Sequence, residues 1–226
     1  MSLLIPNHHP INPDGLVLWL DYLNTGSVAA TGTWKDYSGN GNDGTLTGDT
    51  YVDEQGAHFD GTADHVDLGS LSQLSANGEV SVLFGFEWDG SGATIQTLVA
   101  LENSIGLFRV DIDTSVPEVF LYLNNPGSGN VTYGNTGISA NTPYTVCLLR
   151  QITPTYRNAL YINGTQVGDQ AWQQITSASN LNAFGRRTLT GSFQYPFSGR
   201  IWGGQIYDRP VADSEIQLYS QRTLRA

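Results

Sequence analysis

The sequence is poor in cysteine and has no long apolar run. Cys147 is the one cysteine among 226 residues, so no disulfide can form within the chain. It lies in the apolar segment YTVCLLR, where we expect a buried, small hydrophobic side chain rather than a nucleophile. No segment approaches the roughly 20 apolar residues that a membrane-spanning helix needs. We therefore expect no membrane insertion.

Positive charge is also scarce. Lys and Arg total 10 against 21 Asp and Glu, which gives a formal net charge of −11. The resulting field would repel a nucleic-acid backbone or an anionic membrane surface, so neither is expected as a partner. Charged residues make up 14% of the chain, whereas glycines number 26. This composition favours short strands joined by many turns over a fold that rests on ion pairs.

The N-terminus lacks the basic region and the apolar core of a secretory signal peptide, so we expect synthesis in a cytoplasm. Prolines at positions 6, 10 and 13 favour an extended arm over residues 1–14, before a domain over residues 15–226. Leu3, Leu4 and Ile5 give the arm apolar side chains with which it would dock on a partner protein. An ordinary disordered terminus is the alternative.

From residue 15 onward, short apolar segments alternate with clusters of Gly, Pro, Asn and Asp. The segment VSVLFGFEW (80–88) places apolar side chains at every second position, as a strand with one buried face requires. Asn163-Gly164 lies between two apolar runs and predicts a hairpin over 158–168. The segment AHFDGTADHVDLG (57–69) predicts a second hairpin that turns at Asp60-Gly61.

The C-terminal segment VADSEIQLYSQRTL, after Pro210, predicts a short helix with Asp213 or Ser214 as its N-cap. About a dozen short strands precede it at close spacing. We therefore predict an all-β fold, namely a two-sheet antiparallel β-sandwich (jelly roll) with a short C-terminal helix.

The segment KDYSGNGNDGTL (35–46) concentrates three glycines, two asparagines and two aspartates. A phosphate-binding loop would lead into a helix and usually a lysine, and neither follows here. An EF-hand calcium loop would need Glu at its twelfth position, which is Thr47. We favour a tight turn held by Asx side chains. One structural Ca²⁺ bound by Asp36 and Asp43 is the alternative, and no other cofactor is expected.

Four motifs in order closely resemble the concanavalin A-like lectin/glucanase superfamily, and more narrowly its laminin-G-like (pentraxin-type) jelly-roll domains. They are DYSGNGNDGTL, AHFDGTADHVDLG, ALYINGTQVG and FSGRIWGGQIYDRPVADSEIQLYS. The resemblance extends over residues 15–220. It implies two curved antiparallel sheets packed face to face, with the concave sheet often lining a ligand groove.

The superfamily includes glycoside hydrolases and polysaccharide lyases, so carboxylate pairs need attention. A retaining hydrolase holds two carboxyl groups about 5–5.5 Å apart. Glu87 with Asp89, and Asp111 with Asp113, have the spacing that places two side chains on one face of a strand. The glucanase pattern Glu-x-Asp-x-x-Glu fails in this sequence at Gly92. We therefore predict a protein that is not an enzyme.

A sugar-binding site needs exposed aromatic rings, which stack on the apolar faces of sugars, and amides that bind hydroxyl groups. The candidates are Trp172, Tyr133 and Trp88. Trp88 continues the apolar face of its strand, so a place in the core is its alternative. Tyr133 and Trp172 lie in polar, loop-like segments, where plugging an end of the sandwich is the alternative.

These observations lead to a predicted function. A lectin-like domain with no secretion signal and an extended arm suits a phage virion surface or decoration protein. Such a protein is made in the host cytoplasm, docks on other virion proteins and is later exposed to cell-surface glycans. A carbohydrate-binding module or adhesin of a bacterium, located outside the cell, is the alternative, and a glycan-active hydrolase or lyase is the third. A homo-oligomer is compatible with each.

Overall fold

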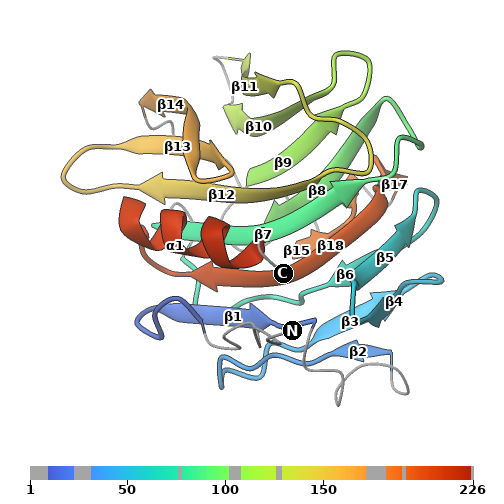
Figure 1. Cartoon of the computed structure of the whole chain (residues 1–226). Coiled ribbons are helices and arrows are strands. Elements are labelled where there is room, and N and C mark those ends of the chain that lie inside the picture. Colours follow the sequence, from blue (N-terminus) through green and yellow to red (C-terminus); the bar gives the residue numbers. More distant parts are fainter. Residues whose placement is uncertain are drawn as a thin grey trace, which may run out of the picture.

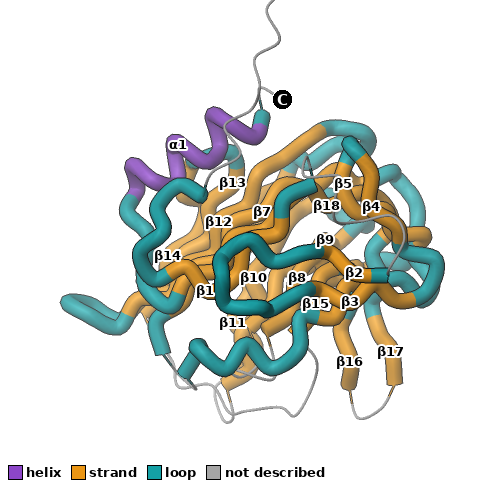
Figure 2. The backbone as a smooth tube through the Cα atoms, turned by 90° about the horizontal axis from the view of Figure 1, so that it is seen from below, coloured by secondary structure: helices purple, strands orange, loops and turns teal. Residues whose placement is uncertain are grey.

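The computed structural model describes residues 10–22, 32–75, 78–101, 108–125, 129–171, 182–189 and 192–224. Within these residues, two large antiparallel sheets pack face to face and one helix lies against the outside of the sandwich (Figures 1 and 2). The predicted all-β sandwich with a short C-terminal helix is confirmed.

The first sheet, sheet A, carries the helix on its outer face. Its strands in spatial order are β14 (Thr165–Ala171), β13 (Arg157–Ile162), β12 (Pro143–Gln151), β7 (Val80–Trp88), β18 (Ser198–Tyr207), β5 (Gly56–Asp60) and β4 (Tyr51–Asp53). Strand β1 (Leu16–Leu20) pairs with the second half of β18, whereas β5 pairs with the first half.

The second sheet, sheet B, closes the other side of the core. Its strands in spatial order are β11 (Gly129–Thr136), β10 (Glu118–Asn125), β9 (Phe108–Asp113), β8 (Ile95–Leu101), β15 (Asn182–Phe184), β6 (His65–Asp67), β3 (Gly44–Thr47) and β2 (Thr33–Trp34). A small separate hairpin consists of β16 (Arg187–Leu189) and β17 (Ser192–Gln194).

The main core fills the space between the two sheets. Strand β7 spans the predicted residues 80–88, and Val82, Phe84 and Phe86 on its inner face are all 0% exposed. Val110 and Ile112 of β9 are buried in the same core from the opposite sheet. Alternate side chains of β7 therefore face outward, and they are buried only where another element packs on the outer face of sheet A.

Helix α1 (Asp213–Thr223) packs on that outer face over part of sheet A (Figure 1). A small outer core forms from Leu83, Cys147, Leu149, Ala159, Tyr161, Tyr207, Val211, Ile216 and Tyr219. Cys147 is buried there as predicted, and burial raises the pKa of its thiol. The described helical structure is not long and apolar enough to cross a lipid bilayer.

The start of the helix differs from the prediction. Its N-cap is Ala212 rather than Asp213 or Ser214. The Ala212 side chain has no oxygen with which to cap the helix, but Glu215 accepts the N–H of Ala212 at 2.7 Å. Arg209 holds the same carboxylate through two N–H groups, so the glutamate half of a capping box is present and a salt bridge anchors it.

One predicted hairpin is confirmed and the other is wrong. Strands β13 and β14 turn at Asn163-Gly164, both with positive φ, as this turn type requires. The segment 57–69 instead crosses from one sheet to the other: β5 pairs within sheet A, and β6 within sheet B. The Asp64 carboxylate makes this corner, because it accepts the N–H groups of Asp60 and Asp49.

The last residues of the predicted arm, 10–14, lie against the sandwich. Ile11 packs on the outer core, and its N–H donates to Gln205 Oε1 at 3.3 Å. Arg209 Nε donates to the carbonyl oxygen of Asp14 at 2.8 Å. Leu3, Leu4 and Ile5, the predicted docking residues, lie outside the described residues.

Candidate functional site

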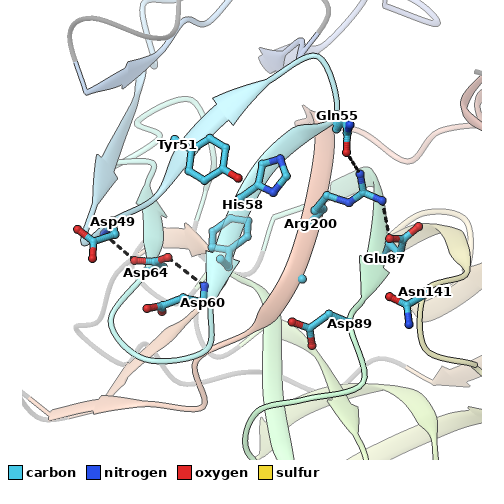
Figure 3. Close-up of a pocket in the computed structure, with 12 residues that line it drawn as sticks. Asp49, Tyr51, Gln55, His58, Asp60, Asp64, Glu87, Asp89, Asn141 and Arg200 are labelled. Atoms are coloured by element: carbon cyan, nitrogen blue, oxygen red, sulfur yellow. Dashed lines mark hydrogen bonds and ion pairs between the residues drawn. The ribbon is translucent and has the colours of Figure 1, made fainter.

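A pocket of about 670 Å³ lies on the part of sheet A formed by β4, β5, β18 and β7 (Figure 3). The residues that line it are mostly polar. They are Asp49, Tyr51, Gln55, His58, Phe59, Asp60, Asp64, Glu87, Asp89, Asn141, Gly199 and Arg200. This is the candidate site, because an open concave surface with convergent polar groups is where ligands usually bind.

A row of four side chains crosses the pocket from strand to strand. The register places Tyr51 of β4 opposite His58 of β5, His58 opposite Arg200 of β18, and Arg200 opposite Glu87 of β7. Their neighbours along each strand face the core, so all four side chains project from the outer face. Antiparallel pairing thus brings together residues that are up to 149 positions apart, since Tyr51 and Arg200 share one row.

An aromatic surface forms at one end of this row. The rings of Tyr51 and His58 are stacked, with centroids 4.3 Å apart and an interplanar angle of 9°. Tyr51 is 54% exposed, and His58 Nε2 is 3.0 Å from Asp53 Oδ1. Burial pushes the pKa of Asp53 upward, but the Gln55 N–H and His58 outweigh it, and the net shift is downward. The carboxylate thereby holds the imidazole beneath the tyrosine.

Arg200 ties the middle of the row to both sides. Its guanidinium donates to Gln55 Oε1, in the turn between β4 and β5, and to Glu87 Oε1 on β7 (Figure 3). The side chain of Arg200 is 27% exposed and that of Glu87 is 18% exposed. This bridge fixes the β4–β5 turn, and so the aromatic surface, relative to the centre of the sheet.

Acidic side chains line one side of the pocket, from Asp49, Asp64 and Asp60 near Tyr51 to Asp89 near Glu87 (Figure 3). Asp64 is only 3% exposed, and burial raises its pKa. Asp60 accepts the hydroxyl and the N–H of Thr62, and these two bonds lower its pKa. Asp89 accepts the Ser198 hydroxyl at 2.7 Å. The carboxylates are therefore held in fixed orientations by hydrogen bonds within the protein.

The two predicted carboxylate pairs lie in different surroundings. Glu87 and Asp89 both line the pocket, so the first pair does reach the candidate site. Asp111 is 0% exposed and accepts Arg109 Nε at 2.6 Å and Thr97 Oγ1 at 2.7 Å, and burial raises its pKa. Asp113 accepts the N–H and hydroxyl of Ser115 in a turn. The second pair is a structural feature of sheet B.

The predicted sugar-binding aromatics do not form this pocket. Trp88 is 8% exposed and belongs to the main core, and its indole N–H donates to the carbonyl of Ser91 at 2.9 Å. Its alternative, a place in the core, is confirmed, and the burial of the ring speaks against the predicted ligand role. Tyr133 lies on β11 opposite Leu121, but its side chain is outside the described set, as is the whole of Trp172.

The glycine-rich loop 35–46 is a turn built around one carboxylate. Asp36 is 5% exposed, and it accepts the N–H groups of Trp19, Ser38 and Asn42 at 2.8–2.9 Å. Asp43 accepts the N–H of Asp36 and the ammonium group of Lys35. Among the described residues, no group of three or more His, Cys, Asp or Glu is placed to hold a metal ion. Calcium binding by Asp36 and Asp43 stays a prediction.

Sequence reasoning missed Tyr51, Gln55, His58 and Arg200. Tyr51, His58 and Arg200 each stand at an outward position of a short alternating segment, and this spacing was the available signal. Gln55 lies in the turn between β4 and β5. The interpretation of 57–69 as a hairpin assigned β5 the wrong neighbour, since β5 lies between β4 and β18. When a strand is assigned the wrong neighbour, the side chains that lie side by side across the true strand pair cannot be identified.

Solved structures that resemble this chain include domains with bound sugars. A sialidase of Trypanosoma rangeli in complex with sialic acid matches with a TM-score of 0.65 and 15% identity, over 93% of this chain and 33% of its own. Domain 4 of AbnA, a GH43 extracellular arabinanase from Geobacillus stearothermophilus, in complex with arabinotriose, matches with a TM-score of 0.61 and 15% identity, over 91% of this chain and 98% of its own.

A third similar structure is the CBM40 of a Ruminococcus gnavus IT-sialidase bound to α2,3-sialyllactose. It matches with a TM-score of 0.52 and 20% identity, over 64% of this chain and 83% of its own. This chain thus spans about a third of the T. rangeli sialidase but nearly all of the arabinanase domain. At these identities the likeness shows the fold.

Sequence comparisons agree with the fold. No curated protein sequence matches the chain. The model of one family, described as the concanavalin A-like lectin/glucanases superfamily, matches residues 60–217. That range includes Glu87, Asp89 and Arg200 of the pocket but not Tyr51 or His58. The chain belongs to the concanavalin A-like lectin/glucanases superfamily.

Proposed function

We propose that this chain is a non-catalytic, lectin-like domain that binds a carbohydrate in the pocket on sheet A. The observation that carries the proposal is the Tyr51 ring, which is 54% exposed at the edge of a polar pocket and is backed by His58. Exposure of a large aromatic ring to water is unfavourable, and the ring matches the apolar face of a sugar.

The polar groups around Tyr51 suit sugar hydroxyls. Asp49, Asp60 and Asp89 offer carboxylate oxygens as acceptors, while Asn141 offers both a donor and an acceptor. Internal hydrogen bonds already orient the Asp60 and Asp89 carboxylates, so a ligand would not bear the entropy cost of ordering them. An open pocket that combines a ring with fixed acceptors is the usual composition of a sugar-binding site.

A binding role agrees better with the carboxylates than a hydrolytic role. Glycoside hydrolysis needs one carboxyl that donates a proton and a second that attacks or activates water. Glu87 is committed to Arg200, and both oxygens of Asp89 accept hydrogen bonds from serine side chains. The sugar-bound CBM40 and arabinanase domain support this choice by analogy of fold.

The matched variants Tyr51→Ala and Tyr156→Ala test the proposal. Tyr156 is 51% exposed, close to the 54% of Tyr51, but it does not line the pocket. Glycan-array screening of the whole chain would identify a ligand, and calorimetric titration would measure its Kd. We expect Tyr51→Ala to weaken binding about tenfold, the value of one aromatic contact, and Tyr156→Ala to leave it unchanged. Equal binding by Tyr51→Ala and the wild type would contradict the proposal.

Turnover tests the alternative of a glycan-active enzyme. We expect no release of reducing ends from the polysaccharides that the array identifies. Turnover by the wild type that disappears in Glu87→Gln would instead favour the hydrolase.

The setting of such binding stays a prediction. Glycan binding is compatible with two settings. One is a phage virion surface, with docking through Leu3, Leu4 and Ile5 on other virion proteins, and the other is an extracellular bacterial module. Mass spectrometry of purified virions and of the secreted fraction distinguishes the two locations.

A further inference from the structure

The charge of the pocket restricts which sugars it can take. Among the residues that the structure describes, five carboxylates line it, from Asp49, Asp60, Asp64, Glu87 and Asp89, against the single guanidinium of Arg200. The whole chain carries a formal net charge of −11, so the field of the protein has the same sign as the pocket. An acidic sugar would meet repulsion both during its approach and after it has bound.

Arg200 is not available as a receptor for an anionic sugar. Its two terminal nitrogens donate to Gln55 and to Glu87, both within the protein. Binding a carboxylate ligand would break the Glu87 ion pair and leave two carboxylates competing for one guanidinium. The described lining of the pocket therefore offers no cation without an internal partner, whereas recognition of a carboxylate usually depends on a free, bidentate one.

A cationic sugar would find attraction at both ends of the pocket. The exposed face of Tyr51 carries the negative potential of an aromatic ring, which attracts an ammonium group. Asp89 and Asp60 stand on either side of the first residues of β18, since Ser198 pairs with Asp60 and donates its hydroxyl to Asp89. Asp49, an exposed residue, adds a further carboxylate to the rim.

We infer that the pocket selects saccharides that carry free amino groups over neutral ones, and rejects acidic saccharides. This inference rests on the proposed function and adds to it the class of ligand. The inferred ligand is positively charged, in contrast to the sialic acid in the T. rangeli sialidase structure, which is an acidic sugar.

Three oligosaccharides of matched length test the inference on the whole chain. The probes are a chitosan oligosaccharide with free amines, the corresponding N-acetylated chitin oligosaccharide, and an oligogalacturonate. Calorimetric titration is carried out at a pH where the amines are protonated, at low and at high salt. We expect the amine form to bind about tenfold more tightly than the neutral form, with an advantage that shrinks as salt increases, and no binding of the acidic form.

Variants separate binding in the pocket from general attraction to an acidic protein. Asp49→Asn removes one charge from the rim, and we expect about threefold weaker binding of the amine form with little change for the neutral form. Asp169→Asn removes one charge from β14, at the opposite edge of sheet A from β4, and should change neither. Tyr51→Ala should weaken both forms.

The outcomes can be told apart. Equal affinity for the amine and neutral forms, binding of the acidic form, or equal effects of Asp49→Asn and Asp169→Asn would overturn the charge inference while the proposed function stands. Failure of all three probes to bind, together with a blank glycan array, would overturn the proposed function and this inference with it.

Discussion

The outer face of sheet A has two parts of opposite character. Under helix α1 it is apolar and buried, with Leu83 at 0% exposure, and around the pocket it is polar and open. Both parts stand on the same two strands. Along β7, Leu83 lies beneath the helix and Glu87 lines the pocket; along β18, Tyr207 lies beneath the helix and Arg200 lines the pocket.

Trp202 marks the boundary between these two parts. A Cβ on Gly85 would lie 2.1 Å from its indole nitrogen, so the ring lies directly against the glycine in the middle of β7. Three successive outward positions of β7, at Leu83, Gly85 and Glu87, thus meet the helix, the indole and the pocket. The inner face of the same strand is uniformly apolar, and its burial supports both parts equally. The buried apolar contacts and the proposed ligand binding therefore belong to different stretches of one face.

Ile216→Ala should cause the largest loss of stability among the variants that this comparison suggests. Ile216 is 1% exposed between the helix and the sheet, and its truncation should cost about 2–5 kcal/mol of the free energy of unfolding. Tyr51→Ala, in the open part, should stay within about 0.5 kcal/mol. Urea denaturation of both variants measures the contrast. Similar losses would show that the two parts are not energetically distinct.

The helix start gives a smaller effect that depends on pH. Arg209 lowers the pKa of Glu215 from 4.5 to about 2, so the ionised form is favoured in the folded state. The resulting stabilisation is complete above pH 4.5 and is lost as pH falls through about 2. We expect Glu215→Gln to cost about 1 kcal/mol near neutral pH and less in strong acid.

Melting temperatures of the wild type and Glu215→Gln between pH 2 and 6 test this expectation. The gap between the two curves should close on acidification. A gap that is constant over the whole range would mean that packing, rather than charge, explains the effect of the variant.

A chelator should have the smallest effect, because we predict no shift of the melting temperature. Hydrogen bonds within the protein occupy the carboxylate oxygens of Asp36, so the 35–46 turn should need no metal. We expect EDTA to leave the melting temperature unchanged, both for the free protein and with sugar bound. A fall of several degrees that added calcium reverses would establish the alternative of a structural Ca²⁺.

The accuracy of the sequence predictions follows the range of the interactions behind them. Strand β7 and the Asn163-Gly164 hairpin depend on local alternation and local turn geometry, and both were predicted. The 57–69 segment failed, because its turn residues resemble those of a hairpin while Asp64 bonds back to Asp49 and turns the chain into the other sheet. Asp213 and Ser214 failed as caps because the N-cap position falls earlier, at Ala212, whose N–H donates to the Glu215 carboxylate that Arg209 holds.

The difference between local and long-range interactions also explains which residues of the candidate site the sequence revealed. Glu87 lies near the end of β7 and Asp89 directly after it, and their spacing identified them as a pair worth testing. Tyr51, His58 and Arg200 come from three strands, and only the register of β4, β5 and β18 makes them a row.

The sequence by itself determined the class of fold and the sign of the charge, since period-two apolar patterns, turn residues and composition are local or additive properties. The family was indicated by the resemblance of four sequence motifs and is shown by the family model. The tertiary structure decided that the 57–69 segment changes sheets, that Trp88 is buried, and that Tyr51 and Arg200 meet in one pocket. The physical reason is that strand pairing joins residues distant in the chain, and its register depends on which faces the whole sandwich can bury.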